Sequence, residues 1–167
     1  AIGEAISKVN DVQKQADLFI HIGQVERGKI AVGDNVNAQV AGSERRRIQA
    51  HHTATHLLQA ALKKIVDSNV SQAGSLVDSD RLRFDFNLNR AVTTEELKQI
   101  ELQINNWIAE AHESVIEVLP ISQAKAKGAI AMFGEKYGAE VRVMDIPNVS
   151  MELCGGTHVK NTSEIGL

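Results

Sequence analysis

Two short segments, far apart in the sequence, carry side chains that bind metal ions. His52 and His56 are four residues apart, and Cys154 and His158 repeat this spacing around two glycines. Residues four apart lie on one face of a helix, so the first pair can direct two imidazole nitrogens at one ion. One thiolate with three imidazoles suits a tetrahedral divalent ion, and zinc is the usual occupant of such a set. We therefore expect these four side chains to form a Zn²⁺ site.

Each half of this pattern also has a plainer interpretation. An isolated pair of histidines is more often packed or solvated than metal-bound, and Cys154 can be a small buried apolar residue beside a glycine turn. Four permanent protein ligands would make the zinc structural, because catalytic zinc needs an open position. Either one ligand, for which we favour Cys154, can be displaced, or zinc orients a substrate that a nearby water molecule attacks. Both alternatives remain open at this level.

The elements that must position these residues include two predicted helices. Apolar residues recur at helical spacing from Ala50 to Val66, the segment that contains the first histidine pair. A second helix is predicted to begin at Thr93, because Thr93 and Glu96 fit a capping box. Its buried face is expected to begin with Leu97. A short helix is predicted near residues 122–127.

Strand patterns and turn residues divide the chain into two predicted domains. Residues 1–47 read as short strands, among them 17–22 and 36–40, and predict a small β-barrel that ends at a polar turn over 42–47. Residues 48–167 are predicted to form an α+β domain, sandwich-like, with a mixed or antiparallel sheet. Its expected strands are 81–86, 115–119 and 140–146, and residues 68–80 are expected to form a loop.

Composition excludes several classes of protein. The 167 residues include 18 Lys and Arg against 21 Asp and Glu, a net charge of −3, so no general positive field attracts nucleic acid. Aromatic residues make up only 4%, too few for a surface that stacks unpaired bases. A single cysteine and the lack of a secretion-signal pattern predict a cytoplasmic protein. No apolar run approaches the ~20 residues that cross a bilayer, so we expect no membrane partner.

The residues around the two ligand pairs resemble a known family. His52-Thr53-Ala54-Thr55-His56-Leu57-Leu58, together with Cys154-Gly155-Gly156-Thr157-His158, resembles the editing domain of alanyl-tRNA synthetase, which free-standing alanyl-tRNA editing proteins share. The resemblance continues through 71–77, 81–86 and 133–138 and covers nearly the whole chain; residues 1–47 resemble the small barrel of that family. The chain starts without Met and stops soon after the second motif, so we expect a fragment of a synthetase.

The resemblance implies hydrolysis of the ester in mischarged Ser-tRNA(Ala) and Gly-tRNA(Ala), with zinc-assisted attack by water. In the family the matching residues His52, His56, Cys154 and His158 bind zinc. The residues that match its amino-acid pocket are Thr55, Gln72 and Ser75. Ala73 departs from the family, in which many members have lysine, and this puts a backbone or phosphate contact in doubt.

Other residues could assist the same reaction. Backbone N–H groups of Gly155 and Gly156 could donate to a developing oxyanion. No general base is assigned, and Glu152 is expected to be a solvated strand residue. Contacts with tRNA phosphates are expected from basic residues that, taken singly, more often belong to a solvated face: Arg45, Arg46, Arg47, Lys125, Lys127 and Lys136.

The expected partners are the acceptor end of tRNA(Ala) and the remaining domains of the synthetase. Two alternative functions remain. One is a structural-zinc module that binds RNA without turnover, and the other is the related editing domain of threonyl-tRNA synthetase.

Overall fold

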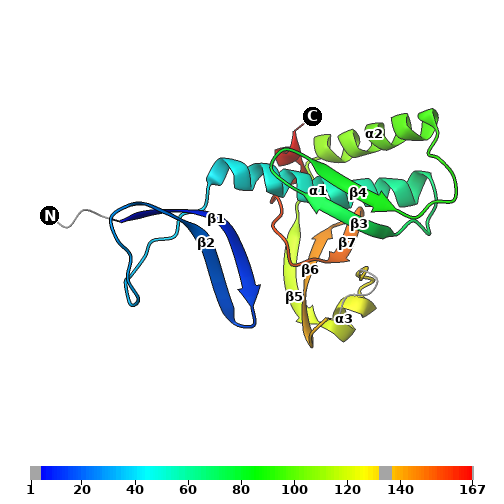
Figure 1. Cartoon of the computed structure of the whole chain (residues 1–167). Coiled ribbons are helices and arrows are strands. Elements are labelled where there is room, and N and C mark those ends of the chain that lie inside the picture. Colours follow the sequence, from blue (N-terminus) through cyan, green and yellow to red (C-terminus); the bar gives the residue numbers. More distant parts are fainter. Residues whose placement is uncertain (1–4, 132–136, 167) are drawn as a thin grey trace. The chain divides into compact units, whose positions relative to one another are not determined.

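A computed structural model of the chain describes residues 5–131 and 137–166 (Figure 1). It divides into two compact units, residues 1–39 and 40–167. Every candidate site residue belongs to the second unit, except that Lys136 and most of the 133–138 segment lie outside the described residues. The predicted domain boundary lay eight residues later in the chain, after Arg47.

The first unit contains one hairpin, formed by β1 (Ile6–Gln15) and β2 (Leu18–Arg27), which pair antiparallel (Figure 1). The predicted strand over 17–22 lies in β2. The predicted strand over 36–40 does not form, and the described part of this unit contains no closed barrel. Two strands cannot close a sheet on itself, and the β-propensity of valines has little effect without a neighbouring strand to pack against. The barrel prediction was therefore wrong for this structure.

Helix α1 (Gly42–Ile65) is the central element of the second unit. It begins at the segment that was predicted to be a polar turn, and Arg45, Arg46 and Arg47 lie exposed in its first two turns. Glutamate and arginine are good helix formers, and solvated turns need no apolar stripe. The apolar period that marked the helix in the sequence therefore starts only where the helix becomes buried.

Helix α2 (Thr94–Ala109) packs against α1 and begins with the predicted capping box. The Thr93 hydroxyl accepts from the Glu96 backbone N–H at 3.2 Å, and the Glu96 carboxylate accepts from the Thr93 backbone N–H at 2.8 Å. The buried face of the helix includes Ile100, Trp107 and Ile108. Leu97, predicted to be part of this face, is 54% exposed.

Replacement of Thr93 by alanine is expected to destabilise the protein by about 1 kcal/mol, because it leaves a helix-terminal N–H group without its acceptor. The free energy of unfolding from urea titration measures this loss. Thr94→Ala, one residue further along and without a cap role, should change stability by less than about 0.5 kcal/mol. Equal effects of the two substitutions would contradict the capping argument.

Two small antiparallel sheets complete the second unit. Strands β3 (Gln72–Val77) and β4 (Leu82–Phe86) form a hairpin, so the loop prediction over 68–80 was wrong for its central part. The pairing shifts register at Gly74, where an added Cβ would come within 2.9 Å of the Asp85 carboxylate. This glycine looked like a loop residue in the sequence, whereas its role is to let the neighbouring strand approach.

The second sheet has the order β5-β6-β7, with strands β5 (Val115–Pro120), β6 (Glu140–Ile146) and β7 (Ser150–Leu153). Helix α3 (Ile121–Ala126) follows β5, and a 3₁₀ helix, η1 (Thr162–Ile165), lies near the end of the chain. Mixed helices and small antiparallel sheets agree with the α+β prediction at this coarse level. None of the described helices is long and apolar enough to span a bilayer.

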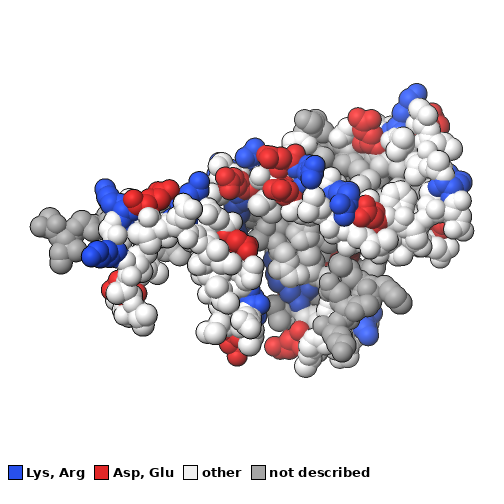
Figure 2. All heavy atoms as spheres, viewed as in Figure 1, with Lys and Arg blue, Asp and Glu red and all other residues white. Residues whose placement is uncertain are grey.

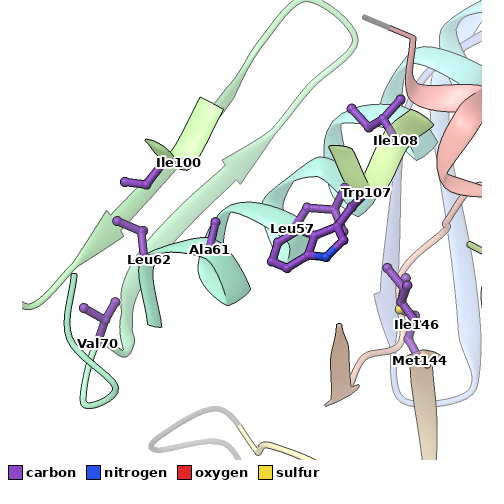
Figure 3. Packing of buried hydrophobic residues seen from close by; sticks show 9 residues of the cluster. All are labelled: Leu57, Ala61, Leu62, Val70, Ile100, Trp107, Ile108, Met144 and Ile146. Carbon is purple, nitrogen blue, oxygen red and sulfur yellow. The ribbon is translucent and has the colours of Figure 1, made fainter. Parts of the chain in front are cut away.

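The main core joins α1 to α2 and to β6 (Figure 3). Leu57, Ala61 and Leu62 of α1 are almost completely buried, and Ile100 and Trp107 of α2 pack into the same cluster. Burial of one side of α1 fixes the rotation of the helix. The residues on its adjoining face are thereby directed at β3 and β7, which α1 also contacts.

Candidate metal centre

Helix α1 presents four polar side chains toward β3 and β7. His52, Thr55, His56 and Gln59 follow one another at helical spacing, and all four line one cavity. Thr55 donates its hydroxyl hydrogen to the carbonyl of His51, one turn earlier, at 2.9 Å. His51 itself is directed elsewhere, since its Nδ1 lies 2.6 Å from the carbonyl oxygen of Asp78. The helix therefore brings both predicted histidines to the same side.

The loop from Cys154 to His158 follows β7 and is attached to the fold at both ends. Arg142 donates from Nη1 to the carbonyl oxygens of Cys154 at 2.8 Å and of Gly156 at 2.6 Å. At the other end, Gln49 donates to the carbonyl of His158 at 3.0 Å. The Arg142 contacts attach the start of the loop to β6, and the Gln49 contact holds its end against α1, although 109 residues separate Gln49 from His158.

The four predicted ligands converge. The ligand atoms of His52, His56, Cys154 and His158 all lie within 4.8 Å of one another. Cys154 Sγ lies 3.4 Å from His52 Nε2 and 3.2 Å from His158 Nε2. The imidazole centroids are 4.2 to 5.3 Å apart. A tetrahedral zinc ion would separate sulfur from nitrogen by about 3.6 Å, so the donor atoms fit one ion.

One atom of this cluster lacks the partner that its burial demands. His56 Nε2 is buried and makes no hydrogen bond. Buried ring nitrogens are normally paired, because an unpaired one loses its contact with water without compensation. A metal ion held by the cluster would satisfy this nitrogen. The donor set and the orphaned atom thus support a group that could bind a metal.

The charges within the cluster favour a cation. Burial raises the pKa of the Cys154 thiol, but donation from the His158 and His52 rings outweighs burial and lowers the pKa to about 3. Burial alone would lower the pKa of His56, but its polar contacts with Cys154 and Glu152, and to a smaller extent their negative charges, raise it to about 9. Burial lowers the pKa of His158. Both shifts favour a thiolate beside a protonated His56, so a metal ion that binds Nε2 must displace the proton at that nitrogen.

A backbone N–H group of the same loop also interacts with the Cys154 sulfur. The Gly156 backbone N–H donates to Cys154 Sγ. Gly156 also lies so close to His52 that an added Cβ would come within 2.5 Å of the ring Nδ1. Gly155, in contrast, has open space where a Cβ would lie. Of the two glycines, Gly156 is the one whose lack of a side chain shapes the cluster.

A small cavity adjoins the cluster. It measures about 50 Å³ and is lined by His52, His56, Cys154 and Glu152 together with Thr55, Gln59, Gln72, Ser75, Val77 and Leu153. One water molecule needs about 10–15 Å³ of such space, so a few non-hydrogen atoms fit. All three predicted pocket residues thus face the cavity, and Gln72 donates to the Ser75 hydroxyl at 3.2 Å.

Sequence reasoning missed two residues of this site. Gln59 is 5% exposed and lines the cavity one turn after Thr55, a position that helical spacing could have indicated. Glu152 is 6% exposed, and its Oε1 lies 3.0 Å from His56 Nδ1. The expectation that Glu152 is a solvated strand residue was wrong, because β7 packs this face of the strand against α1.

The described basic residues that were considered for contacts with tRNA do not form one group. Arg45, Arg46 and Arg47 lie at the start of α1, and Lys125 and Lys127 lie in and just after α3, well apart from it in Figure 1. Lys127 is paired with Glu117 at 2.7 Å. On the face drawn in Figure 2, positive and negative side chains are interspersed. The described residues of the second unit form no continuous positive surface on this face.

Comparison with known proteins relates the chain to tRNA synthetases. Residues 141–167 match the family described as the threonyl and alanyl tRNA synthetase second additional domain. The chain is 68% identical to the alanine–tRNA ligase of Acaryochloris marina over 164 residues, which are 98% of this chain and 19% of the relative. Identity to the alanine–tRNA ligase of Synechococcus elongatus is 71% over 162 residues, 97% of this chain and 18% of the relative. The chain thus spans about a fifth of the length of these relatives.

Proposed function

Because the chain is homologous to a segment of the alanyl-tRNA synthetases, we propose that it removes wrongly attached serine or glycine from tRNA(Ala) by hydrolysing the ester bond. The observation that carries this proposal is the convergence of four ligand atoms beside a cavity with a polar lining. The matched domain family covers both threonyl and alanyl synthetases. Relatives at 66 to 71% identity are alanine–tRNA ligases, which favours alanyl over threonyl editing.

Zinc suits the cluster because thiolate and imidazole ligands are the set it prefers, and when bound it would orient the substrate and polarise the ester. His52, His56, Cys154 and His158 would hold it. The donor set alone does not require an oxygen ligand or a redox metal. The backbone N–H of Gly155 is left as a donor toward a developing oxyanion, since that of Gly156 is directed at sulfur.

The polar lining of the cavity supplies a reason for selectivity. An apolar synthetic pocket rejects an added hydroxyl by only about 10²-fold, so a second pocket is needed to remove serine. Thr55 donates its own hydrogen to the helix backbone and keeps its oxygen as an acceptor for a serine hydroxyl. Gln72 keeps its carbonyl as a further acceptor, since its amide donates to Ser75. Alanine would leave these groups unpaired.

Binding of the tRNA itself is proposed to depend on further parts of the synthetase. A net charge of −3 and scattered basic residues provide little general attraction for phosphates. Arg45, Arg46, Arg47, Lys125 and Lys127 remain candidates for weak contacts with the acceptor end of tRNA(Ala). The remainder of the synthetase chain is the proposed partner that supplies affinity.

The test is single-turnover deacylation with the protein in excess over tRNA, so that weak binding does not hide the reaction. Ser-tRNA(Ala) is expected to be hydrolysed at least ~10-fold faster than Ala-tRNA(Ala), and a zinc chelator should abolish the difference. Gln72→Ala should reduce the preference for serine while the zinc content stays at one ion per chain. Equal rates on the two esters would refute the proposed selectivity.

The same experiment addresses the structural-zinc alternative. Four protein ligands would close the coordination shell of zinc, which favours a structural role. In that case the chain would bind zinc and show no deacylation, and Gln72→Ala would change nothing. Hydrolysis that depends on both zinc and Gln72 would exclude this alternative.

A further inference from the structure

A carboxylate is buried directly behind the metal-ligand cluster. Glu152 lies on β7, and its side chain and that of His56 are 8% and 9% exposed. Glu152 Oε1 lies 3.0 Å from His56 Nδ1. Burying a carboxylate is costly unless it is paired and hydrogen-bonded, so its position requires a reason.

Two donors converge on a single oxygen of this carboxylate. Ser150, two residues earlier on the same strand, donates its hydroxyl hydrogen to Glu152 Oε1 at 2.7 Å. The other donor is His56 Nδ1. An ionised carboxylate only accepts hydrogen bonds, so the ring must carry its proton on Nδ1 to make this contact. Ser150 restricts the rotation of the carboxylate and thereby the direction from which it meets the ring.

The contact determines which nitrogen of His56 is offered to a metal. With Nδ1 holding a proton toward Glu152, the ring has only Nε2 to donate as a lone pair. Nε2 is the buried nitrogen that has no hydrogen-bond partner, and His56 is one of the four residues whose ligand atoms converge. A ring rotated by half a turn about the Cβ–Cγ bond would place the carbon Cε1 where Nε2 now lies, and no lone pair would be offered there.

The ring of His158 has an uncharged partner instead of a carboxylate. His158 Nδ1 lies 3.3 Å from the uncharged Thr53 hydroxyl, which also accepts from the Val159 backbone N–H at 3.2 Å. Within residues 5–131 and 137–166, Glu152 is the one carboxylate that contacts a ring of the cluster. The negative charge of Glu152 therefore acts on the metal-ligand cluster mainly through His56.

We propose that Glu152 is a positioning residue for the metal, which holds His56 in the Nδ1-protonated form and directs Nε2 at the ion. This deepens the proposed function and rests on its metal site, not on the deacylation step. In this role Glu152 acts through His56, although it also lines the adjoining cavity. It fixes the orientation of a ligand and adds a negative charge that favours a divalent cation.

The test measures zinc affinity by competition with a chromophoric chelator. Glu152→Gln keeps the size of the side chain and an acceptor oxygen but removes the charge, and we expect it to weaken zinc binding by about 10- to 100-fold. Ser150→Ala leaves the carboxylate in place and should weaken binding by only a few-fold. Glu117→Gln makes the same chemical change at an exposed site on β5 and should leave zinc affinity unaltered.

Two further measurements separate positioning from a merely structural role. Zinc affinity is compared well below the melting temperature, because the zinc-free Glu152→Gln protein should melt earlier when the protonated His56 loses its buried partner. Nitrogen-15 chemical shifts of the zinc-bound protein should show His56 protonated at Nδ1, with this state less well defined in the variant. A folded Glu152→Gln with unaltered zinc affinity, or with a lower melting temperature alone, would overturn the proposal.

Failure of the proposed reaction would be recognised separately. If the unaltered chain binds zinc but does not hydrolyse the esters, the deacylation proposal fails and the role of Glu152 stands on the affinity series. If the unaltered chain binds no zinc, the inference is overturned together with the metal site. The Ser150→Ala variant keeps the test decisive even if Glu152→Gln does not fold.

Discussion

Replacement of Cys154 by serine is expected to weaken zinc binding by roughly 100-fold or more. Structural zinc sites have apparent binding free energies of about 10–16 kcal/mol, so one of four ligands accounts for about 3 kcal/mol. Serine keeps the size of the side chain, but its hydroxyl is a far poorer ligand than a thiolate. The low pKa of Cys154, about 3, means that the sulfur is already deprotonated before the metal arrives. Deacylation of Ser-tRNA(Ala) should be lost with the metal.

Zinc stoichiometry by elemental analysis and zinc affinity by chelator competition measure this effect. Because Cys154 is the single cysteine of the chain, alkylation by iodoacetamide reports directly on its sulfur. Zinc should protect the unaltered protein from alkylation. Retention of tight zinc binding by Cys154→Ser, or alkylation that zinc does not slow, would show that the sulfur is not a ligand.

Replacement of Gly156 by alanine is expected to weaken zinc binding by a comparable amount without removing any ligand. The added Cβ would lie within 2.5 Å of His52 Nδ1, closer than atoms can approach, and the ring is the part that can move. His52 is only half-buried, so its ring can swing outward and leave the cluster. The loss should therefore equal that of one ligand, about 3 kcal/mol.

Gly155→Ala is the matched control for this prediction. It makes the same substitution one residue earlier, where no atom lies within 4 Å of the added Cβ. Zinc affinity should then stay within about twofold of the unaltered protein, because no ligand is displaced. His52→Ala in the Gly156→Ala background should add almost nothing further, since contacting residues are not additive. Equal losses in both glycine variants would indicate a general requirement for loop flexibility instead.

These variants test how the loop from Cys154 to His158 positions the metal ligands. Arg142 holds the carbonyls of Cys154 and Gly156, and this places the glycine directly against the His52 ring. The close approach of Gly156 to His52 and the buried carboxylate beside His56 position the two rings. The same rigid arrangement that suits a metal also places the cavity lined by Thr55 and Gln72 beside it.

Local signals in the sequence were sufficient for several features. The spacing of His52 and His56 on an apolar helical period placed both rings on one face, because helix geometry is regular over four residues. The Thr93 and Glu96 pair identified the start of α2, since a capping box involves contacts within one turn. The alternation of polar and apolar residues over 81–86 predicted β4, because successive side chains of a strand point to opposite faces.

Other features could be settled only by the tertiary structure. Gly74 lies in a strand at a point where Asp85 approaches it closely, and residues 36–40 form no strand in the described structure. Glu152 is buried against His56 because β7 packs on α1, which no local pattern reveals. Residue types and short spacings thus determined which side chains could act together. Packing between distant segments decided which of them do, since burial and pairing depend on neighbours far away in the sequence.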